Sequence, residues 1–348
     1  MDLRSHLLAG HVIPAHPLAL DGRRRFSERH QRALTRYYLD SGVGGLAVGV
    51  HSTQFEIRDP AHGLFRPVLE LAAHTQREHQ AAGGREVAMI AGICGKTAQA
   101  VAEAELARSL GYHAGLVSMA AFREEPEAAI LEHVATVART IPVVGFYLQP
   151  AVGGRVLSHA FWRRFVDIPE VVAIKIAPFN RYQTIDVVRA LALSGRTDLA
   201  LYTGNDDTIV ADLLTPFTFA TPNGPRTCRI VGGLLGHWGV WTHAAVRLMA
   251  EIQAVNRGST LAAQWLDRAV AVTDMNAALF DAANRFHGCI PGILEVLRRQ
   301  GLVETILCLN PAETLSPGQA EELTRVSKAY PELIDDAFIL ANRDRWLS

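Results

Sequence analysis

The sequence predicts an α/β fold: a closed (β/α)8 TIM barrel with a C-terminal helical extension. Short runs of apolar and β-branched residues alternate with amphipathic stretches up to about residue 256, as expected of repeated βα units. Eight such runs can be counted, and eight strands in alternation with helices are typical of this barrel. The chain has 348 residues and 49% hydrophobic content, enough for a barrel-sized core. We therefore expect the barrel over residues 1–256 and a helical region packed on it over residues 257–348.

The eight predicted strands are short and apolar, as in a parallel sheet that is covered on both faces. They span residues 11–18, 45–51, 86–94, 114–119, 142–148, 171–176, 200–203 and 229–235. An open doubly wound sheet is the alternative. However, no Gly-x-Gly-x-x-Gly sequence follows the first strand, so the closed barrel is preferred.

Three of the predicted helices have clear ends, because a polar residue opens the helix or a glycine closes it. They run from Ser27 to Gly42, from Thr97 to Gly111, and over residues 186–193 before Gly195. These helices separate consecutive predicted strands, as βα units require.

The last third of the chain has a different pattern. From Ser259 onward only helical patterns remain, with breaks at residues 288–291 and 311–317. Residues 217–228 are rich in Thr, Pro and Gly, which predicts a long loop before the eighth strand.

Composition narrows the possible functions. The net charge of -1 gives no electrostatic footprint for nucleic acid. The four cysteines lie far apart without a Cys-x-x-Cys pair, which suggests neither a disulfide framework nor a zinc knuckle. Histidines and prolines interrupt the apolar segment at residues 7–20, and no apolar run is long enough to span a membrane. We expect a cytoplasmic protein.

Lys175 is the leading candidate for catalysis. It lies in the predicted sixth strand, residues 171–178 (VVAIKIAP), and is one of only three lysines among 34 basic residues. Burial in such a strand lowers the pKa of an ammonium group from about 10.4 and makes the neutral amine accessible near pH 7. A neutral lysine amine is the nucleophile that forms imines, and arginine cannot replace it.

Other candidates follow from the ends of the strands, where the active sites of these barrels lie. The second strand ends at Ser52 and Thr53, whose hydroxyls and neighbouring amides can cradle a carboxylate; the alternative is a helix cap. Tyr147, at the end of the fifth strand, can pass protons or serve as a core aromatic. After the seventh strand, Asp206 and Asp207 can hold substrate hydroxyls or cap the next helix.

Together these positions resemble the dihydrodipicolinate synthase and N-acetylneuraminate lyase family. Its members show Gly-Thr-Thr-Gly-Glu, Tyr-x-x-Pro and Ile-Lys stretches, and a Gly-x-Asp-Glu or Gly-Asp-Asp stretch after the seventh strand. The corresponding segments are residues 51–55 (HSTQF), 147–150 (YLQP), 174–175 (IK) and 204–207 (GNDD). The resemblance covers roughly residues 13–307, and Ala91-Gly92 at the end of the third strand adds to it.

The resemblance implies a class I aldolase. Lys175 would form a Schiff base with pyruvate or another 2-oxo acid, without metal or organic cofactor. Ser52 and Thr53 would hold the carboxylate of that acid, and Thr53 and Tyr147 would act with Lys175 in catalysis. The other implied substrate-binding residues are Gln54, Gly204, Asp206 and Asp207. Family members are commonly homo-oligomers, so a tetramer or dimer is expected.

Departures from the family pattern bear on the substrate. The synthases have a Tyr-Tyr pair after the fourth strand, where this chain has Met119 and two alanines, and an arginine where it has Val152. Residues 150–154 (PAVGG) are more similar to the sialic acid lyases, and Arg155 follows them. We therefore expect a lyase, aldolase, synthase or hydratase that acts on a 2-oxo acid, other than dihydrodipicolinate synthase itself.

Two alternatives remain open at this point. His16, His51 and His237 fall near predicted strand ends, and three imidazoles could bind zinc in a metal-dependent TIM-barrel hydrolase. No His-x-His or His-Glu-x-x-His sequence supports this reading. A catalytically inactive family member with a binding role is the second alternative.

Overall fold

A computed structural model describes residues 1–348, and its fold is the predicted (β/α)8 barrel with C-terminal helices. The chain divides into two compact units. The first comprises Met1–His11 and Ala88–Leu234, and the second comprises Val12–Val87 and Leu235–Ser348. Each of the eight predicted strands is present, and several are shorter than expected. The predicted number of strands in the main sheet is therefore confirmed.

The first unit contains six parallel strands in the order β10-β7-β6-β5-β4-β3. Their bounds are β3 Ala88–Ile93, β4 Ala114–Ser118, β5 Val143–Leu148, β6 Val171–Ala177, β7 Ala200–Thr203 and β10 Gly232–Leu235. Every residue in them except Leu148 is buried, as expected for parallel strands that are covered on both faces.

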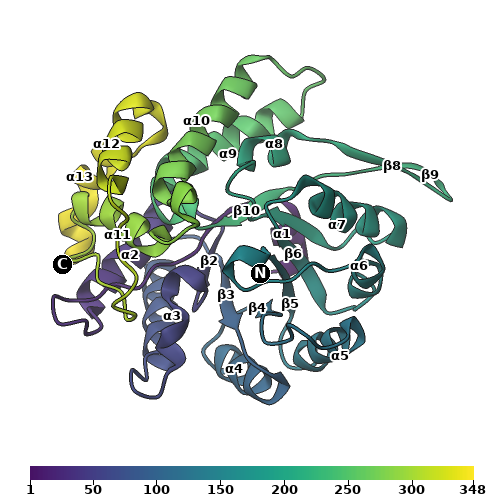
Figure 1. Ribbon diagram of the computed structural model, residues 1–348, viewed down its shortest axis with the longest axis horizontal. Helices are drawn as coiled ribbons and strands as arrows, with labels where there is room; N and C mark the ends of the chain where they lie inside the picture. Colours follow the sequence, from purple (N-terminus) through teal and green to yellow (C-terminus); the bar gives the residue numbers. More distant parts are fainter. The chain divides into compact units, whose positions relative to one another are not determined.

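The helices of the first unit are α1 Leu3–Leu8, which precedes all strands, and five that follow strands of the sheet: α4 Thr97–Ser109, α5 Glu127–Ala138, α6 His159–Phe165, α7 Arg181–Ser194 and α8 Ile209–Leu214. A 3-10 turn lies at Pro150–Val152. In Figure 1, α4 to α7 follow one another along the outer side of the strands, and each contacts the next. The helix α1 contacts β6 and β7, where the Tyr202 hydroxyl donates to the Leu7 carbonyl at 2.8 Å.

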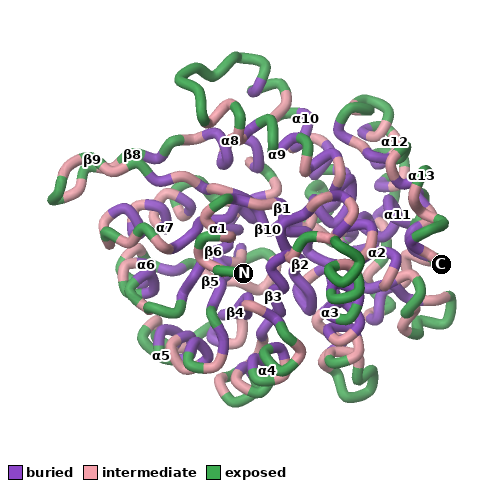
Figure 2. The backbone as a smooth tube through the Cα atoms, turned by 180° about the vertical axis from the view of Figure 1, so that it is seen from behind, coloured by how far each residue is buried: buried purple, intermediate pink, exposed green.

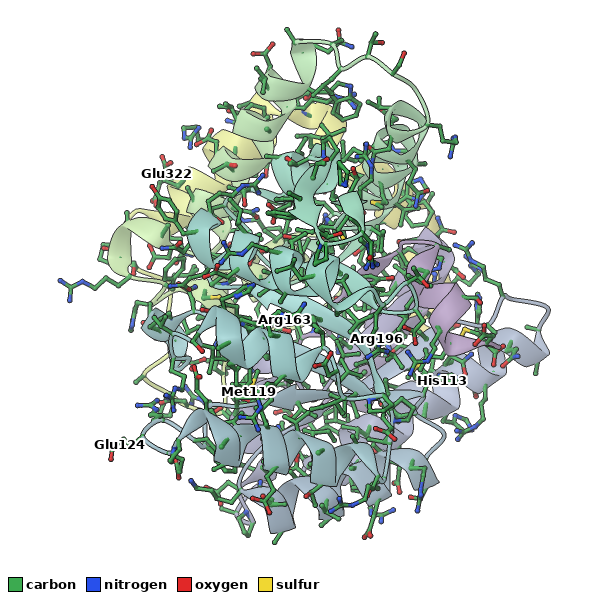
Figure 3. All side chains as sticks on the ribbon, turned by 90° about the vertical axis from the view of Figure 1, so that its right-hand side faces the viewer. His113, Met119, Glu124, Arg163, Arg196 and Glu322 are labelled. Atoms are coloured by element: carbon green, nitrogen blue, oxygen red, sulfur yellow. The ribbon has the colours of Figure 1, made fainter.

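The beginning of β6 is tied down by Arg196, which is labelled in Figure 3. Its guanidinium donates to the carbonyls of Val166, Ile168 and Val171 at 2.8–3.0 Å and pairs with Asp198 at 2.9 Å. These bonds connect three backbone carbonyls of the segment between α6 and β6 to one guanidinium. The segment that leads into β6, the strand of Lys175, is therefore held in place by these bonds.

The prediction of a loop at residues 217–228 is wrong. The segment forms an antiparallel hairpin of β8 (Phe217–Thr221) and β9 (Gly224–Cys228). The side chains of β8 alternate between more buried and exposed positions. Thr221 pairs with Gly224, so Pro222 and Asn223 form the two-residue turn, and Gly224 has a φ of 100°, which favours glycine. Figure 2 shows the hairpin extending to a more exposed tip.

The second unit contains β1 (Val12–Pro14) and β2 (Gly45–Val48), which are adjacent and parallel: the Gly44 amide donates to the Val12 carbonyl at 3.1 Å. Its helices are α2 Glu28–Ser41, α3 Phe65–Ala81, α9 Thr242–Asn256, α10 Gln264–Leu279, α11 Cys289–Arg299, α12 Gln319–Ala329 and α13 Asp336–Leu347. Short 3-10 turns occupy His51–Thr53, Phe55–Arg58, His237–Gly239, Ala282–Asn284 and Pro331–Leu333. None of the helices in the chain combines the length and apolar character needed to cross a membrane.

The predicted helix ends are largely confirmed. Gly42 and Gly195 end α2 and α7 with φ of 90° and 78°, in the left-handed region that favours glycine. The helix α7 begins at Arg181 rather than near residue 186, because the Asn180 side chain accepts from two amides of its first turn. The division of the chain at residue 257 stays a prediction.

Candidate active site

Lys175 lies in the middle of β6, beside Phe146 of β5 and Tyr202 of β7 in the strand register. Its side chain is only 9% exposed. The ammonium nitrogen lies 4.5 Å from the centroid of the Phe146 ring, at a distance typical of cation–π contacts. The sequence-based expectation that Lys175 is buried in its strand is confirmed.

Burial lowers the pKa of Lys175 to about 8, and the negative charge of Asp206 opposes this effect. An amine with that pKa is neutral in roughly a tenth of the molecules at pH 7, compared with less than one in a thousand at the ordinary pKa of about 10.4. Lys175 can therefore act as a nucleophile near neutral pH.

Gly204 makes the space that the Lys175 side chain occupies. A Cβ atom on residue 204 would lie 2.6 Å from Lys175 Cε and 2.8 Å from Ala177 Cβ, closer than carbon atoms can approach. The Gly204 amide donates to the Ile176 carbonyl at 2.7 Å, which holds the loop against β6. The role of Gly204 is thus steric.

A buried polar network fixes the segment that follows Gly204. The Asn205 side chain accepts from the Phe179 amide at 2.9 Å and donates to Thr184 at 3.1 Å and to Asp212 at 2.9 Å. The Thr203 hydroxyl donates to the same carboxylate at 2.7 Å. Because these groups are buried and paired, the backbone on both sides of Asn205 is held in one position.

The two carboxylates after Asn205 have different surroundings. Asp206 is half-buried and interacts electrostatically with Lys175, whereas Asp207 is exposed. The structure therefore brings Lys175, Gly204 and Asp206 together. Binding of substrate hydroxyls by Asp206 and Asp207 stays a prediction.

Tyr147 is completely buried at the end of β5, and its register partner on β6 is Ile176. Its hydroxyl accepts a hydrogen bond from the Leu157 amide at 3.2 Å, and its ring packs against Trp162 of α6 at 4.9 Å between centroids. Burial raises the pKa of Tyr147, so the phenol keeps its proton at neutral pH. Its role in moving protons stays a prediction.

Ser52 and Thr53 belong to the second unit and are both buried. The Ser52 hydroxyl donates to the Ala15 carbonyl at 2.9 Å, and the Thr53 hydroxyl donates to the His16 carbonyl at 2.7 Å. The Thr53 oxygen also accepts from the Gly49 amide at 3.0 Å. To donate to a substrate carboxylate, either hydroxyl has to exchange its carbonyl partner, and that role stays a prediction.

Gln54 has two unusual features. Its φ of 68° lies in the left-handed region, at the position where the family pattern has glycine. Its side chain is 1% exposed; Oε1 accepts from the Leu309 amide at 2.6 Å, while Nε2 is buried without a hydrogen-bond partner. The unpaired Nε2 donor of this strained residue could bind an acceptor from a ligand, such as a carboxylate oxygen.

The three histidines of the zinc alternative are in the second unit. Both ring nitrogens of His16 have partners: Nδ1 meets the Pro17 carbonyl and Nε2 meets the Thr35 hydroxyl, each at 2.9 Å. Burial lowers the pKa of both His16 and His237 to about 4, so both are neutral. No group of three or more His, Cys, Asp or Glu side chains is placed to hold a metal ion.

Two residues that contact the candidate residues were not predicted from the sequence. The first is Phe146, whose ring lies against the Lys175 amine. The alternation of side chains along β5 and β6 indicates this contact only when the register of the two strands is known. The contact between Gln54 and Leu309 joins residues 255 positions apart, and no local pattern signals it.

The Arg155 side chain hydrogen-bonds to backbone carbonyls. It donates to the carbonyls of Phe122 and Glu125 at 3.0 and 2.7 Å, and it lines, with Met119, Phe146 and Tyr147, a space of only about 10 Å³. That volume holds at most about one water molecule.

Comparison with known proteins places this geometry in context. The dihydrodipicolinate synthetase family matches residues 9–218. A 4-hydroxy-tetrahydrodipicolinate synthase from Thiobacillus denitrificans is 28% identical over 309 residues, which cover 87% of this chain and 90% of the relative.

Solved structures share the fold. The pyruvate complex of the chloride-inhibited dihydrodipicolinate synthase from Acinetobacter baumannii superposes with a TM-score of 0.74 at 17% identity, over 95% of this chain and 99% of that one. The pyruvate complex of N-acetylneuraminate lyase from Fusobacterium nucleatum gives 0.69 at 16% identity, over 94% and 98%.

Proposed function

Because this chain belongs to the dihydrodipicolinate synthetase family, whose members are lyases of the class I aldolase type, we propose that it forms or cleaves a carbon–carbon bond in pyruvate or another 2-oxo acid through an imine on Lys175. The observation that supports this most strongly is the buried amine itself, with its pKa lowered to about 8. The space left by Gly204 lets this amine lie within the fold instead of in solvent.

The chemistry follows from the amine. Neutral Lys175 Nζ attacks the ketone carbon of the acid, and loss of water from the resulting carbinolamine gives the imine. Once protonated, the imine withdraws electrons from the adjacent carbon. Loss of a proton or cleavage of a carbon–carbon bond at that carbon gives an enamine, which takes up a proton or a carbonyl electrophile. Hydrolysis then returns the amine. The chemistry requires no metal or organic cofactor.

Other residues would position the acid and move protons. We assign the binding of the substrate carboxylate to Ser52, Thr53 and Gln54. The unpaired Nε2 donor of Gln54 supports the role of that residue. Thr53 and Tyr147 would transfer protons. Gly204, Asp206 and Asp207 would contact the remainder of the substrate, and Asp206 would also stabilise the iminium charge.

The second substrate or leaving fragment is proposed to differ from that of dihydrodipicolinate synthesis. Met119 is buried at the end of β4, where the synthases use a tyrosine for proton transfer, and a thioether cannot transfer protons. Val152 likewise cannot bind a second carboxylate.

Trapping with borohydride tests the proposal. The intact protein is treated with borohydride in the presence of pyruvate and a panel of other 2-oxo acids, and its mass is measured. We expect the gain of one reduced adduct with at least one acid, and no gain for Lys175→Arg, which keeps the charge but has no accessible neutral amine. An unchanged mass with every acid would show that the proposal is wrong.

We also expect a homo-oligomer in the cytoplasm. All four cysteines are free, which fits a reducing compartment. Light scattering of the purified protein tests the oligomeric state.

A further inference from the structure

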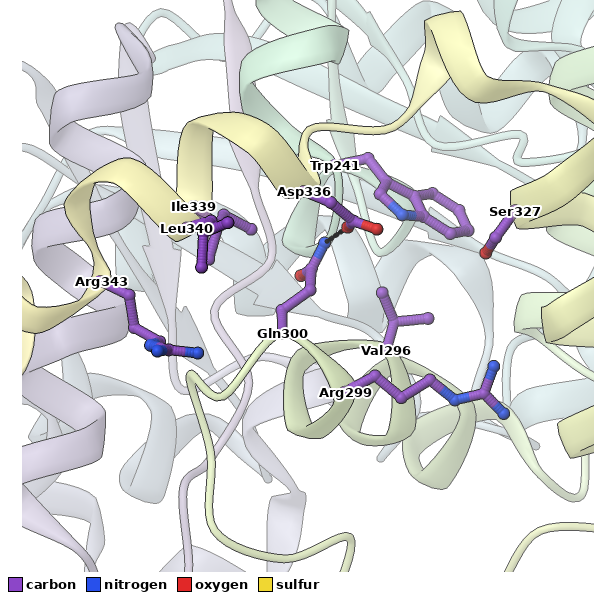
Figure 4. A pocket seen from close by; sticks show the side chains of 9 residues that line it. All are labelled: Trp241, Val296, Arg299, Gln300, Ser327, Asp336, Ile339, Leu340 and Arg343. Carbon is purple, nitrogen blue, oxygen red and sulfur yellow. Dashed lines mark hydrogen bonds between the residues drawn. The ribbon is translucent and has the colours of Figure 1, made fainter.

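A cavity of about 220 Å³ lies in the second unit among α9, α11, α12 and α13 (Figure 4). Apolar side chains of Trp241, Val296 and Ile339 line part of it, and polar side chains of Gln300, Asp336 and Arg343 line another part. None of these residues belongs to the candidate active site. A concave site with an apolar wall and a few polar groups is the usual form of a small-molecule site, and this volume suits a ligand smaller than the typical drug-sized one.

Gln300 presents an unsatisfied acceptor in this cavity. Its side chain is 9% exposed, and Nε2 donates to Asp336 Oδ1 at 2.7 Å and approaches Asp335 Oδ1 at 3.4 Å. The amide orientation is determined by these carboxylates, because a flipped amide would place oxygen against oxygen. The other amide atom, Oε1, is buried and has no hydrogen-bond partner. Such a group carries a desolvation cost that a ligand with a donor would remove.

Arg343 supplies a positive charge with little internal compensation. Its Nε approaches Asp344 at 3.4 Å, but Asp344 is 92% exposed, so this pair contributes little. Neither Nη atom donates a hydrogen bond within the chain. A Cβ on residue 301 would lie 2.9 Å from Arg343 Nη1, so Gly301 leaves the space that the guanidinium occupies.

The second arginine of the cavity differs. Arg299 is held by Glu295 at 2.8 Å and donates to Thr324 at 3.0 Å. In the view of Figure 4, Arg299 and Arg343 flank Gln300. The guanidinium of Arg299 also donates to the Ala320 carbonyl, whereas the Nη atoms of Arg343 have no such partner. One arginine with uncommitted donors and one unpaired acceptor therefore line the same cavity, beside the Asp336 carboxylate that holds the Gln300 amide.

We propose that this cavity is a second binding site, which takes a small α-amino or α-hydroxy carboxylate with an apolar side chain. Arg343 binds the carboxylate through its two Nη atoms, the geometry in which arginine binds carboxylates most strongly. The amino or hydroxyl group donates to Gln300 Oε1. The apolar side chain lies against Val296, Ile339 and Trp241. A 2-oxo acid has no donor for Gln300, so this site selects a different class of acid from the one that reacts with Lys175.

Calorimetric titration of the full-length protein tests the chemistry. The probes are L-valine, 2-hydroxy-3-methylbutanoate and 3-methylbutanoate, which share an apolar branch and a carboxylate but differ in the donor. We expect the first two to bind at least roughly tenfold more tightly than the third, as one hydrogen bond to a buried acceptor allows. Absence of binding by all three, or equal binding by all three, would overturn the proposal.

Variants test the location. Arg343→Met should weaken L-valine binding by roughly tenfold or more, since it removes a charge-assisted contact. Arg257→Met is the matched control, because Arg257 is exposed at the end of α9, outside the cavity, and it should bind L-valine as the unmodified protein does. Unchanged binding in Arg343→Met would place the ligand elsewhere and overturn the assignment.

Gln300→Met tests the acceptor. In a variant that retains the circular dichroism spectrum and cooperative melting of the unmodified protein, L-valine and 3-methylbutanoate should bind with similar affinity. Discrimination that persists in this folded variant would contradict the role of Gln300. The Arg343 side chain is one-third exposed, so its replacement should leave the fold intact. Arg343→Met therefore tests the location of the site even if Gln300→Met fails to fold.

Discussion

The Cε atom of Lys175 lies 2.6 Å from the position that a Cβ on Gly204 would take, so the candidate nucleophile occupies space that only glycine leaves. Gly204→Ala should displace the lysine, destabilise the fold by about 1–3 kcal/mol, as overpacking does, and slow adduct formation with pyruvate. Urea unfolding and timed borohydride trapping measure the two effects.

Gly22→Ala is the control for Gly204→Ala. A Cβ on residue 22 would meet only a Glu304 oxygen at 3.7 Å, an ordinary contact. This variant should keep both stability and trapping rate. A Gly204→Ala protein that traps pyruvate as fast as the control would contradict the steric role.

Imine formation should depend on pH through Lys175. The pKa of this amine is about 8, so the neutral fraction rises about tenfold per pH unit below 8 and levels off above it. The initial rate of trapping, measured between pH 6 and 10, should follow that curve. A rate that keeps rising up to pH 10 would show an amine with an ordinary pKa.

The buried lysine should also cost stability at neutral pH. Its folded-state pKa of about 8 lies below the unfolded value of about 10.4, so the unfolded chain binds more protons between these values, and the free energy of unfolding rises with pH there. At pH 7 the cost is about 3 kcal/mol. Lys175→Met should therefore be more stable than the unmodified protein at pH 7, by urea unfolding, and the gain should shrink above pH 8. A less stable Lys175→Met at pH 7 would contradict this account.

Asp335 should make the stability depend on pH in the acid range. The carboxylate is 4% exposed, and burial raises its pKa to about 6, although it accepts from the Tyr37 hydroxyl at 2.7 Å. A raised pKa in the folded state adds stability below about pH 4 that is lost as the pH rises through 6, up to about 3 kcal/mol.

Comparison with Asp335→Asn isolates this effect. The stability of the unmodified protein relative to the variant should fall between pH 4 and 7. Asp344→Asn, at a site that is 92% exposed, is the matched control for the loss of one carboxylate. A flat difference for Asp335→Asn would show that Asp335 has an ordinary pKa in the fold.

Tyr147→Phe should separate proton transfer from imine formation. We expect exchange of pyruvate methyl protons with deuterated water, followed by NMR, to slow roughly 10²-fold, while the trapped adduct still forms. Tyr182→Phe, at a side chain that is 83% exposed, serves as control. Equal exchange rates in both variants would remove Tyr147 from the mechanism.

The strand count and the buried lysine could be predicted from the sequence because both are local signals. Apolar runs such as residues 171–177 mark buried strands by composition alone, and a lysine within one is conspicuous among so many arginines. Glycine ends of helices, such as Gly42, are equally local. The hairpin at residues 217–228 could not be distinguished from a loop, because Thr, Pro and Gly are typical of both.

The immediate surroundings of the site could not be predicted in the same way. The position of Phe146 under the lysine depends on strand register, and the clash that requires Gly204 depends on the path of the lysine side chain. Gln54 reaches Leu309 across most of the chain. These are tertiary relationships, which no window of the sequence contains.

The identity of the reactive lysine tests the central claim most directly. After borohydride reduction with pyruvate at pH 8, peptide mapping by mass spectrometry locates the adduct among Lys96, Lys175 and Lys328, the three lysines of the chain. The account predicts a modification on Lys175 alone. An adduct on Lys96 or Lys328, or an unmodified Lys175 in a protein that turns over a 2-oxo acid, would contradict it.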